Sequence, residues 1–248
     1  MDCKKALIET DGDIEAAVDW LRTKGLAAAA KKAGRVTAEG LVALAVNGNK
    51  GALVELNAET DFVARNDQFQ ELVGDMAEAA IENGASVDAL NAATLANGKS
   101  VEQSVVDAIA TIGENMTLRR TAQLSVSEGV IASYMHNATA PNKGKIGVLV
   151  GMQSSGDQNR LAEVGKQVAM HVAASNPLAL NRDSVNPDDV ERERAVLVEQ
   201  AKASGRPDNI IEKMVDGRMR KFFEESTLLE QAFVIDPDKS VGKAIEEL

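Results

Sequence analysis

The chain has 248 residues, a net charge of −11 from 27 basic and 38 acidic side chains, and few aromatic residues. This length allows one large or two modest domains, each able to bury a core of its own. The acidic balance disfavours direct binding to nucleic acid, because an acidic surface repels phosphate backbones. A single cysteine, Cys3, excludes a disulfide within the chain and fits a reducing compartment. We expect its thiol to be buried and inert.

Hydropathy predicts a cytoplasmic protein that does not enter a membrane. The apolar runs fall short of the roughly 20 residues that a membrane-spanning helix needs. The N-terminus also lacks the basic and then apolar profile that is typical of a signal peptide.

Two short helices are predicted within residues 1–30. Residues 4–9 form the first, and Asp13 is placed to cap a second helix from Ile14 to Arg22. The alanine-rich stretch over residues 27–34 is expected to be a linker. Because two helices this short cannot enclose a core, we expect them to dock elsewhere or to belong to a helical domain whose first helix is absent from this sequence.

An α+β region is predicted over residues 35–126. Strand-like runs at residues 41–46 and 52–56 are joined by the turn-forming cluster Asn47-Gly48-Asn49, which indicates a hairpin. Apolar residues at helical spacing then predict an amphipathic helix over residues 67–82. The region is completed by a loop that can include a helical turn, a helix ended by Gly113, and a strand, at residues 84–100, 101–112 and 116–126.

The same order of elements recurs over residues 127–186. Strands at residues 129–134 and 145–152 precede a helix over residues 159–175, which Pro177 ends. The residue identities of the two regions barely match, so the repeat is one of architecture. We therefore predict two similar α+β subdomains, the second completed by residues 226–240.

A charged helical hairpin is predicted over residues 187–225, inserted in the second subdomain. Its second arm has a clear apolar stripe, so we expect a projecting antiparallel coiled coil. A strand at residues 232–235 follows, and residues 241–248 form a short helix that begins a C-terminal module. The predicted fold class is therefore α+β, with a small helical N-terminal part, two subdomains of antiparallel strands and an inserted helical hairpin.

The sequence carries no pattern of reactive residues that would indicate an enzyme, a metal site or a bound cofactor. His136 and His171 have no cysteine or histidine neighbours at metal-ligand spacing. Residues 240–243 lack the preceding glycine and the following hydroxyl residue of a phosphate-binding loop. Ser154 and Ser155 lie in a plain turn, not in the context of a nucleophilic serine. An enzyme is therefore the least favoured class of function.

The segment from Glu55 to Arg65 ends a predicted strand and leads into the helix over residues 67–82. Thr60 or Asp61 could cap that helix, which is an ordinary structural role. Phe62 could pack into the core of the subdomain, and the residues alone favour this interpretation.

The run Glu55-Leu56-Asn57-Ala58-Glu59-Thr60-Asp61-Phe62-Val63-Ala64-Arg65 resembles a signature of the elongation factor Ts family, in which a small sulfur or hydroxyl residue is common where this chain has Ala58. Residues 1–7 resemble the end of that family's other signature. Segments similar to the family also lie, in the same order, at residues 111–115, 133–136 and 169–175. Since Met1 falls inside a signature, we expect the family's first helix to be missing. Leu248 stops inside an apolar pattern, so we also expect the C-terminal module to be cut short there.

The resemblance implies a nucleotide-exchange factor that is not an enzyme and uses no cofactor. Its partner would be the GTPase elongation factor Tu, either GDP-bound or nucleotide-free, and residues 1–30 would be part of a ubiquitin-associated-like domain. Phe62 would enter between two helices of Tu near its magnesium site, with Asp61 beside it. The implied partner-binding residues are Thr60, Asp61, Phe62, Val63, Ile112, Gly113, His136, Met170 and Val172.

An acidic adaptor or chaperone-like binding module is the alternative function, using the terminal helices and the hairpin. His136 is equally well interpreted as a partner contact or as a strand-end histidine bonded to nearby backbone, whereas a structural role is favoured for His171. The apolar stripe of the hairpin is expected to be its own core seam, with self-association or partner binding as the alternative. A homodimer of the complex with Tu is left open, because the sequence does not reveal an oligomeric state.

Overall fold

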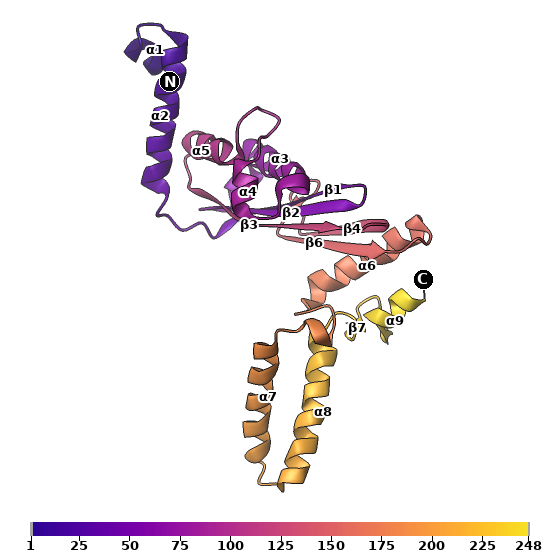
Figure 1. Cartoon of the computed structure of the whole chain (residues 1–248). Helices are drawn as coiled ribbons and strands as arrows, with labels where there is room; N and C mark the ends of the chain where they lie inside the picture. Colours follow the sequence, from indigo (N-terminus) through magenta and orange to yellow (C-terminus); the bar gives the residue numbers. More distant parts are fainter. Residues whose placement is uncertain (1, 248) are drawn as a thin grey trace. The chain divides into compact units, whose positions relative to one another are not determined.

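The computed structural model describes residues 2–247 and combines helices with small antiparallel sheets (Figure 1). The predicted α+β fold class is therefore confirmed. The chain divides into two compact units, Met1–Gly156 and Asp157–Leu248. The finer domain boundaries drawn from the sequence stay predictions.

The first unit contains most of the strands, β1 to β6. Its elements in chain order are α1 (Asp2–Glu9), α2 (Ile14–Lys32), β1 (Glu39–Asn47), β2 (Lys50–Ala58), the 3-10 helix η1 (Val63–Arg65), α3 (Asp67–Asn83), α4 (Val87–Ala92), α5 (Val101–Ile112), β3 (Met116–Ser125), β4 (Gly129–His136), β5 (Lys143–Gly144) and β6 (Ile146–Gln153). The hairpin, the two longer helices and the strands predicted between residues 41 and 152 are thus confirmed within a few residues at their ends.

Helix α2 is longer than the sequence predicts. Asp13 caps it as expected, because its carboxylate accepts a hydrogen bond from the Ala16 N–H at 3.0 Å. The expected linker over residues 27–34 is wrong, since the helix continues to Lys32. Alanine has the highest helix propensity, and Lys31 and Lys32 favour the negative end of the helix dipole.

Cys3 is exposed, so the expected buried thiol is wrong. The cause is the shortness of α1, which has eight residues. From Cys3 to the end of this helix, only Ala6 is buried, and even Leu7 and Ile8 remain open to solvent.

The main sheet of the first unit is antiparallel, with the strand order β3-β2-β1-β5. β1 and β2 pair without a slip from Glu39↔Ala58 to Asn47↔Lys50. The loop between them has two residues, and its first, Gly48, has a φ of +58°, which glycine adopts without strain. A two-residue loop of this kind fixes the register of the whole hairpin.

Helix α3 covers one face of this sheet. Its buried residues Phe69, Val73, Met76 and Ala80 recur at three- and four-residue spacing and pack in one core with apolar residues of β1 and β2. The β4–β6 hairpin packs on the opposite face. A Cβ added at Gly51 would lie 2.8 Å from Ile131, so glycine allows the hairpin to approach this closely.

The second unit is mainly helical. Its elements are α6 (Gln158–Ser175), the 3-10 helix η2 (Arg182–Ser184), α7 (Pro187–Lys202), α8 (Asp208–Ser226), β7 (Ala232–Phe233), β8 (Asp236–Ser240) and α9 (Val241–Glu246). α7 and α8 form the predicted helical hairpin, and its arms share a core of Leu197, Ala201, Ile211, Val215 and Met219. The expectation that the apolar stripe is the hairpin's own seam is confirmed. The strand expected at residues 232–235 is shorter, because Val234 and Ile235 form the turn into β8.

His171 lies fully buried on α6 and has the structural role that the sequence favoured. Its Nδ1 accepts a hydrogen bond from the Val234 N–H at 3.2 Å. Its Nε2 lies 2.9 Å from the Gln231 Oε1, to which it donates, since a neutral ring with an accepting Nδ1 carries its proton on Nε2. The histidine thus ties α6 to the strands that follow α8.

Candidate functional site

The segment between β2 and α3 leaves the sheet in a turn and re-enters the core before the helix begins. β2 ends at Ala58, and η1 forms one turn of 3-10 helix over Val63–Arg65. Asn66, not Thr60 or Asp61, caps α3, because its Oδ1 accepts a hydrogen bond from the Phe69 N–H at 3.0 Å. The predicted capping roles of Thr60 and Asp61 are therefore wrong.

Phe62 projects into solvent from this turn. Its side chain is 76% exposed, whereas Val63 and Ala64, the next two residues, are 5% and 4% exposed. The interpretation of Phe62 as a core residue is therefore wrong. Val63 and Ala64 take that place, since both belong to the core cluster while Phe62 precedes the 3-10 turn. Val63 was a predicted partner-binding residue, but its side chain belongs to the core beneath the turn.

Two carboxylates hold the turn against the segment between α5 and β3. Glu114 accepts hydrogen bonds from Thr60 at both oxygens, from the N–H at 2.9 Å and from the Oγ1 hydroxyl at 2.7 Å. In the opposite direction, Glu59 Oε1 accepts a hydrogen bond from the Asn115 N–H at 2.6 Å. These reciprocal contacts, between residues 59–60 and residues 114–115, are called the carboxylate clasp below.

The sheet explains why these four residues meet. Ala58 pairs with Met116 at the end of the β2–β3 ladder. The residues just beyond a paired end in an antiparallel ladder are neighbours, so Glu59 and Asn115 lie opposite each other. Sequence reasoning did not select Glu59, Glu114 or Asn115, although the paired strand ends were a signal that could have found them.

Arg35 extends the clasp toward β1. Its carbonyl oxygen accepts a hydrogen bond from the Asn115 Nδ2 at 2.9 Å, and its Nη1 lies 3.3 Å from Glu59 Oε1. The hydrogen bond from the Asn115 N–H lowers the pKa of Glu59 below its ordinary value, and the nearby Arg35 charge lowers it further. Glu59 is therefore ionised at neutral pH, which favours its accepting role.

Ile112 and Gly113 lie beside the clasp. Gly113 ends α5 in the left-handed conformation, with a φ of +94°, and its N–H donates to the Ile109 carbonyl oxygen at 3.1 Å. This helix end turns the chain so that Glu114 reaches Thr60. Ile112 is half-buried against the core, whereas Gly113 is exposed. The structure thus brings Thr60, Asp61 and Phe62 together with two other predicted contact residues.

His136 lies at the exposed end of β4, in the same unit. Its Nδ1 is 3.1 Å from the Tyr134 hydroxyl, and its carbonyl oxygen accepts a hydrogen bond from the Lys145 N–H at 3.3 Å. The ring is therefore oriented by a side chain, whereas only the backbone of His136 takes part in strand-end bonding.

Met170 and Val172 lie on α6, in the second unit. Met170 is 37% exposed and Val172 is half-buried, on either side of the fully buried His171. Both side chains are therefore at least partly accessible to a partner.

Replacing Glu114 with alanine is expected to loosen the turn that carries Phe62. The variant loses both hydrogen bonds to Thr60, and bonds to a charged group contribute about 1.5–3 kcal/mol each. Because the carboxylate is partly solvated, we expect a loss at the lower end of this energy range. That loss corresponds to about tenfold faster hydrogen exchange of the Thr60 amide. Thr60→Val is the matched control, since it removes the hydroxyl bond and keeps the amide bond. Equal exchange in the two variants would contradict the clasp.

The part of the chain that the structure describes contains neither a cluster suited to a metal ion nor a helix suited to span a membrane. Within residues 2–247, no group of three or more His, Cys, Asp or Glu side chains is arranged to hold a metal ion. None of the helices in that range combines the length and apolar character needed to cross a membrane. Exposed aromatic side chains on ordered turns are typical of contacts between proteins. The fold and the site together define an α+β module that presents an exposed aromatic side chain on an ordered turn.

Comparison with known proteins assigns this module to a family. The family model described as "Elongation factor TS" matches residues 59–248. Elongation factor Ts of Sinorhizobium medicae (strain WSM419) is 62% identical over 248 residues, which are 100% of this chain and 81% of that protein. Elongation factor Ts of Parvibaculum lavamentivorans (strain DS-1) is 59% identical over 247 residues, 99% of this chain and 80% of that protein. The chain belongs to the elongation factor Ts family, a family of translation elongation factors.

Proposed function

We propose that this chain is a guanine-nucleotide exchange factor for elongation factor Tu. It would bind Tu in its GDP-bound form, promote the release of GDP and allow GTP to bind, and so return Tu to translation elongation. The observation that carries the proposal is the exposure of Phe62, 76%, on a turn held by the carboxylate clasp. Membership of the elongation factor Ts family supports it.

Exchange requires that the factor bind nucleotide-free Tu more tightly than GDP-bound Tu. By thermodynamic reciprocity, the factor then weakens GDP binding by the same ratio. A protein with equal affinity for both states would not change the nucleotide affinity at all. The contacts that matter are therefore those that form only when the nucleotide site is distorted.

Phe62 is suited to such a contact. It would enter between two helices of Tu beside the magnesium ion, with Asp61 next to it, and displace the groups that hold the magnesium-bound water. The GDP phosphates would then lose part of their charge neutralisation. Burial of one phenylalanine contributes about 1.5–3 kcal/mol, which corresponds to about ten- to a hundredfold in affinity. An acceleration of GDP release greater than about a hundredfold needs further contacts with Tu.

Further contacts would come from both units. The family resemblance implies contacts with Tu from both units: Thr60, Ile112, Gly113 and His136 in the first, and Met170 and Val172 in the second. Val63 has a different role here, because its side chain is 5% exposed. It would support the turn from the core side while Phe62 makes the contact.

A direct experiment tests the proposal. Tu loaded with a fluorescent GDP analogue is mixed with excess unlabelled GDP, and release is followed by stopped flow with and without this chain. We expect release to accelerate with the concentration of the chain. Capture from a bacterial lysate should also recover Tu as the main partner. Unchanged release together with capture of other proteins would favour an adaptor instead.

Replacing Asp61 with alanine is expected to weaken exchange less than replacing Phe62. Asp61 is exposed, and within residues 2–247 its carboxylate has no hydrogen-bond or ion-pair partner. Solvated carboxylates contribute about 0–1 kcal/mol to a contact, below the contribution of a buried phenylalanine. Isothermal titration of each variant into nucleotide-free Tu measures the order, and a larger loss for Asp61→Ala would reverse the assigned roles.

A further inference from the structure

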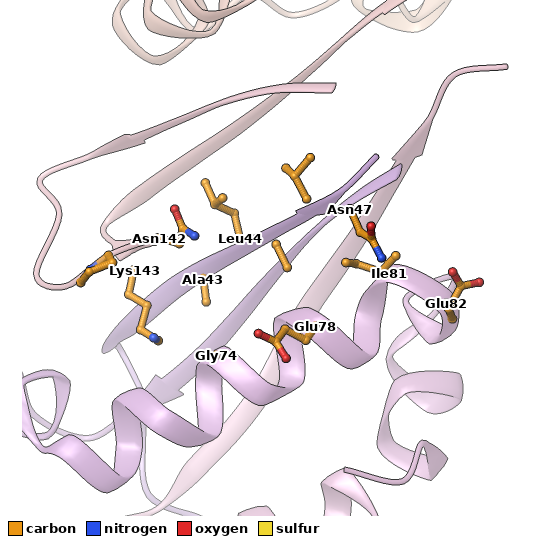
Figure 2. Close-up of a pocket in the computed structure, with 12 residues that line it drawn as sticks. Ala43, Leu44, Asn47, Gly74, Glu78, Ile81, Glu82, Asn142 and Lys143 are labelled. Carbon is orange, nitrogen blue, oxygen red and sulfur yellow. The ribbon is translucent and has the colours of Figure 1, made fainter. Parts of the chain in front are cut away.

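A cavity of about 440 Å³ lies in the first unit between β1, α3 and the loop that precedes β5 (Figure 2). Its volume falls within the range of about 300–1,000 Å³ that ligand pockets occupy. Its floor is formed by small side chains of β1, including Ala43 and Ala45, and its wall by α3. The cavity thus opens along one edge of the main sheet.

The edge of β1 is only partly paired. β5 pairs with it at Val42 and Ala43, and the Leu44 N–H donates to the Asn142 carbonyl oxygen at 3.0 Å. The pairing then stops for two local reasons. Asn142 has a φ of +59°, which turns the chain away, and the preceding Pro141 has no N–H to donate.

The open part of this edge carries backbone groups of Val46. In a strand paired on both sides, successive residues direct their N–H and C=O groups to opposite neighbours. Because the Leu44 N–H points toward β5, the groups of Val46 point to the same side. Within residues 2–247, no strand lies beside Val46 on that side. An extended segment placed there could pair with it.

The wall of the cavity is acidic. Four carboxylates at spacings of four, three and four residues share one side of α3, and these are Glu71, Asp75, Glu78 and Glu82. Burial raises the pKa of Asp75 above its ordinary value, and the neighbouring Glu71 and Glu78 raise it further. The side chain of Glu82 pairs with Lys50 at 2.8 Å. Glu78 has no ion-pair or hydrogen-bond partner among residues 2–247.

Two lysines, one on each neighbour of β1, relate positions along β1 to positions along α3. Lys143 of β5 pairs with Ala43 and lies against the helix, because a Cβ added at Gly74 would be 3.0 Å from its Nζ. Asn47 lies four residues further along β1, and Lys50, its partner on β2, reaches Glu82. The advance of about 13 Å along the strand matches about 12 Å for the eight residues from Gly74 to Glu82. Ala45 therefore lies level with Glu78.

We propose that this edge binds an extended, basic segment of another protein by β-strand addition. The segment pairs with the N–H and C=O of Val46, and a lysine or arginine opposite Ala45 reaches Glu78. Backbone pairing supplies affinity and alternate side chains supply specificity in this mode of recognition. The proposal is independent of the exchange function, since it uses none of the residues of the Phe62 turn.

A titration followed by amide NMR of the full chain tests the proposal. The probe is a five-residue capped peptide that alternates valine and lysine, with a peptide that alternates valine and glutamate as its counterpart. We expect the basic peptide to shift the amides of Val46 and Asn47, and the acidic peptide to leave them in place. Glu78→Lys should weaken binding about tenfold or more, since one contact worth 1.4 kcal/mol is about tenfold.

Two further variants separate the contribution of charge to peptide binding from the contribution of backbone pairing. Glu71→Lys makes the same charge change on the same side of α3 but outside the cavity, so it should weaken binding less than threefold. Val46→Pro removes the outward N–H without taking a hydrogen bond from the β1–β2 ladder, and should abolish binding. Equal binding of both peptides, or no shift at about 1 mM peptide, would overturn the proposal. Concentration-dependent shifts without peptide would assign the edge to a second copy of this chain instead.

Discussion

Phe62→Ala is expected to leave the fold intact and to reduce the acceleration of GDP release by about ten- to a hundredfold, the effect of losing about 1.5–3 kcal/mol of apolar burial. The side chain is 76% exposed in the free protein, so its loss removes little from the core. The loss falls on the complex with nucleotide-free Tu, where the ring would be buried. Stopped-flow release of a fluorescent GDP analogue measures it.

Two controls make this result specific. Unfolding of Phe62→Ala should match that of the parent chain within about 0.5 kcal/mol, as for other surface substitutions. Val36→Ala removes another exposed apolar side chain, 81% exposed, from outside the turn, and should leave exchange unchanged. A parent-like exchange rate for Phe62→Ala would exclude the ring as the exchange contact. An equal loss in Val36→Ala would show a general dependence on surface apolarity.

Local patterns in the sequence predicted the elements around the site well. The hairpin of β1 and β2 follows from alternating residues around a turn that includes Gly48, and α3 follows from the spacing of Phe69, Val73 and Met76. Both patterns report burial on one face of a regular element, which is what sequence periodicity encodes. The end of α5 at Gly113 was predictable for a related reason, because glycine adopts the left-handed conformation there without strain.

The turn itself could not be predicted in this way. Between β2 and α3 the chain has no regular period, so the choice between Phe62 and Val63 for the core depended on the geometry of a single 3-10 turn. That geometry is fixed in part by Glu114, which is 54 residues distant from Thr60. A contact of this range follows from the pairing of β2 with β3 and leaves no local pattern.

The errors at the N-terminus have a different origin. Residues 27–34 were expected to be a linker, yet alanine, which dominates this stretch, is the residue that most favours a helix. Cys3 was expected to be buried because cysteine is buried in most proteins. A helix of eight residues with a single buried side chain, Ala6, offers it no cover. The first error came from overlooking the helix propensity of alanine, and the second from applying an average burial to a helix too short to cover Cys3.

Phe69 lies seven residues after Phe62, and its side chain is buried where that of Phe62 is exposed. It lies on α3, and its side chain is fully buried in the core that also contains Val63 and Ala64. Phe69→Ala is therefore expected to lower the free energy of unfolding by about 3–5 kcal/mol, through lost burial and the cavity that remains. Urea unfolding followed by the fluorescence of Trp20, the only tryptophan in the chain, reports on the first unit.

The pair of variants distinguishes the two roles of phenylalanine in this segment. Phe69→Ala should lose stability, whereas its folded fraction should still accelerate GDP release, because the exposed ring and the carboxylate clasp remain. Phe62→Ala should show the opposite behaviour, with stability retained and exchange lost. Similar losses of stability in both variants would mean that Phe62 is held in the core in solution. That result would remove the exposed ring on which the exchange proposal depends.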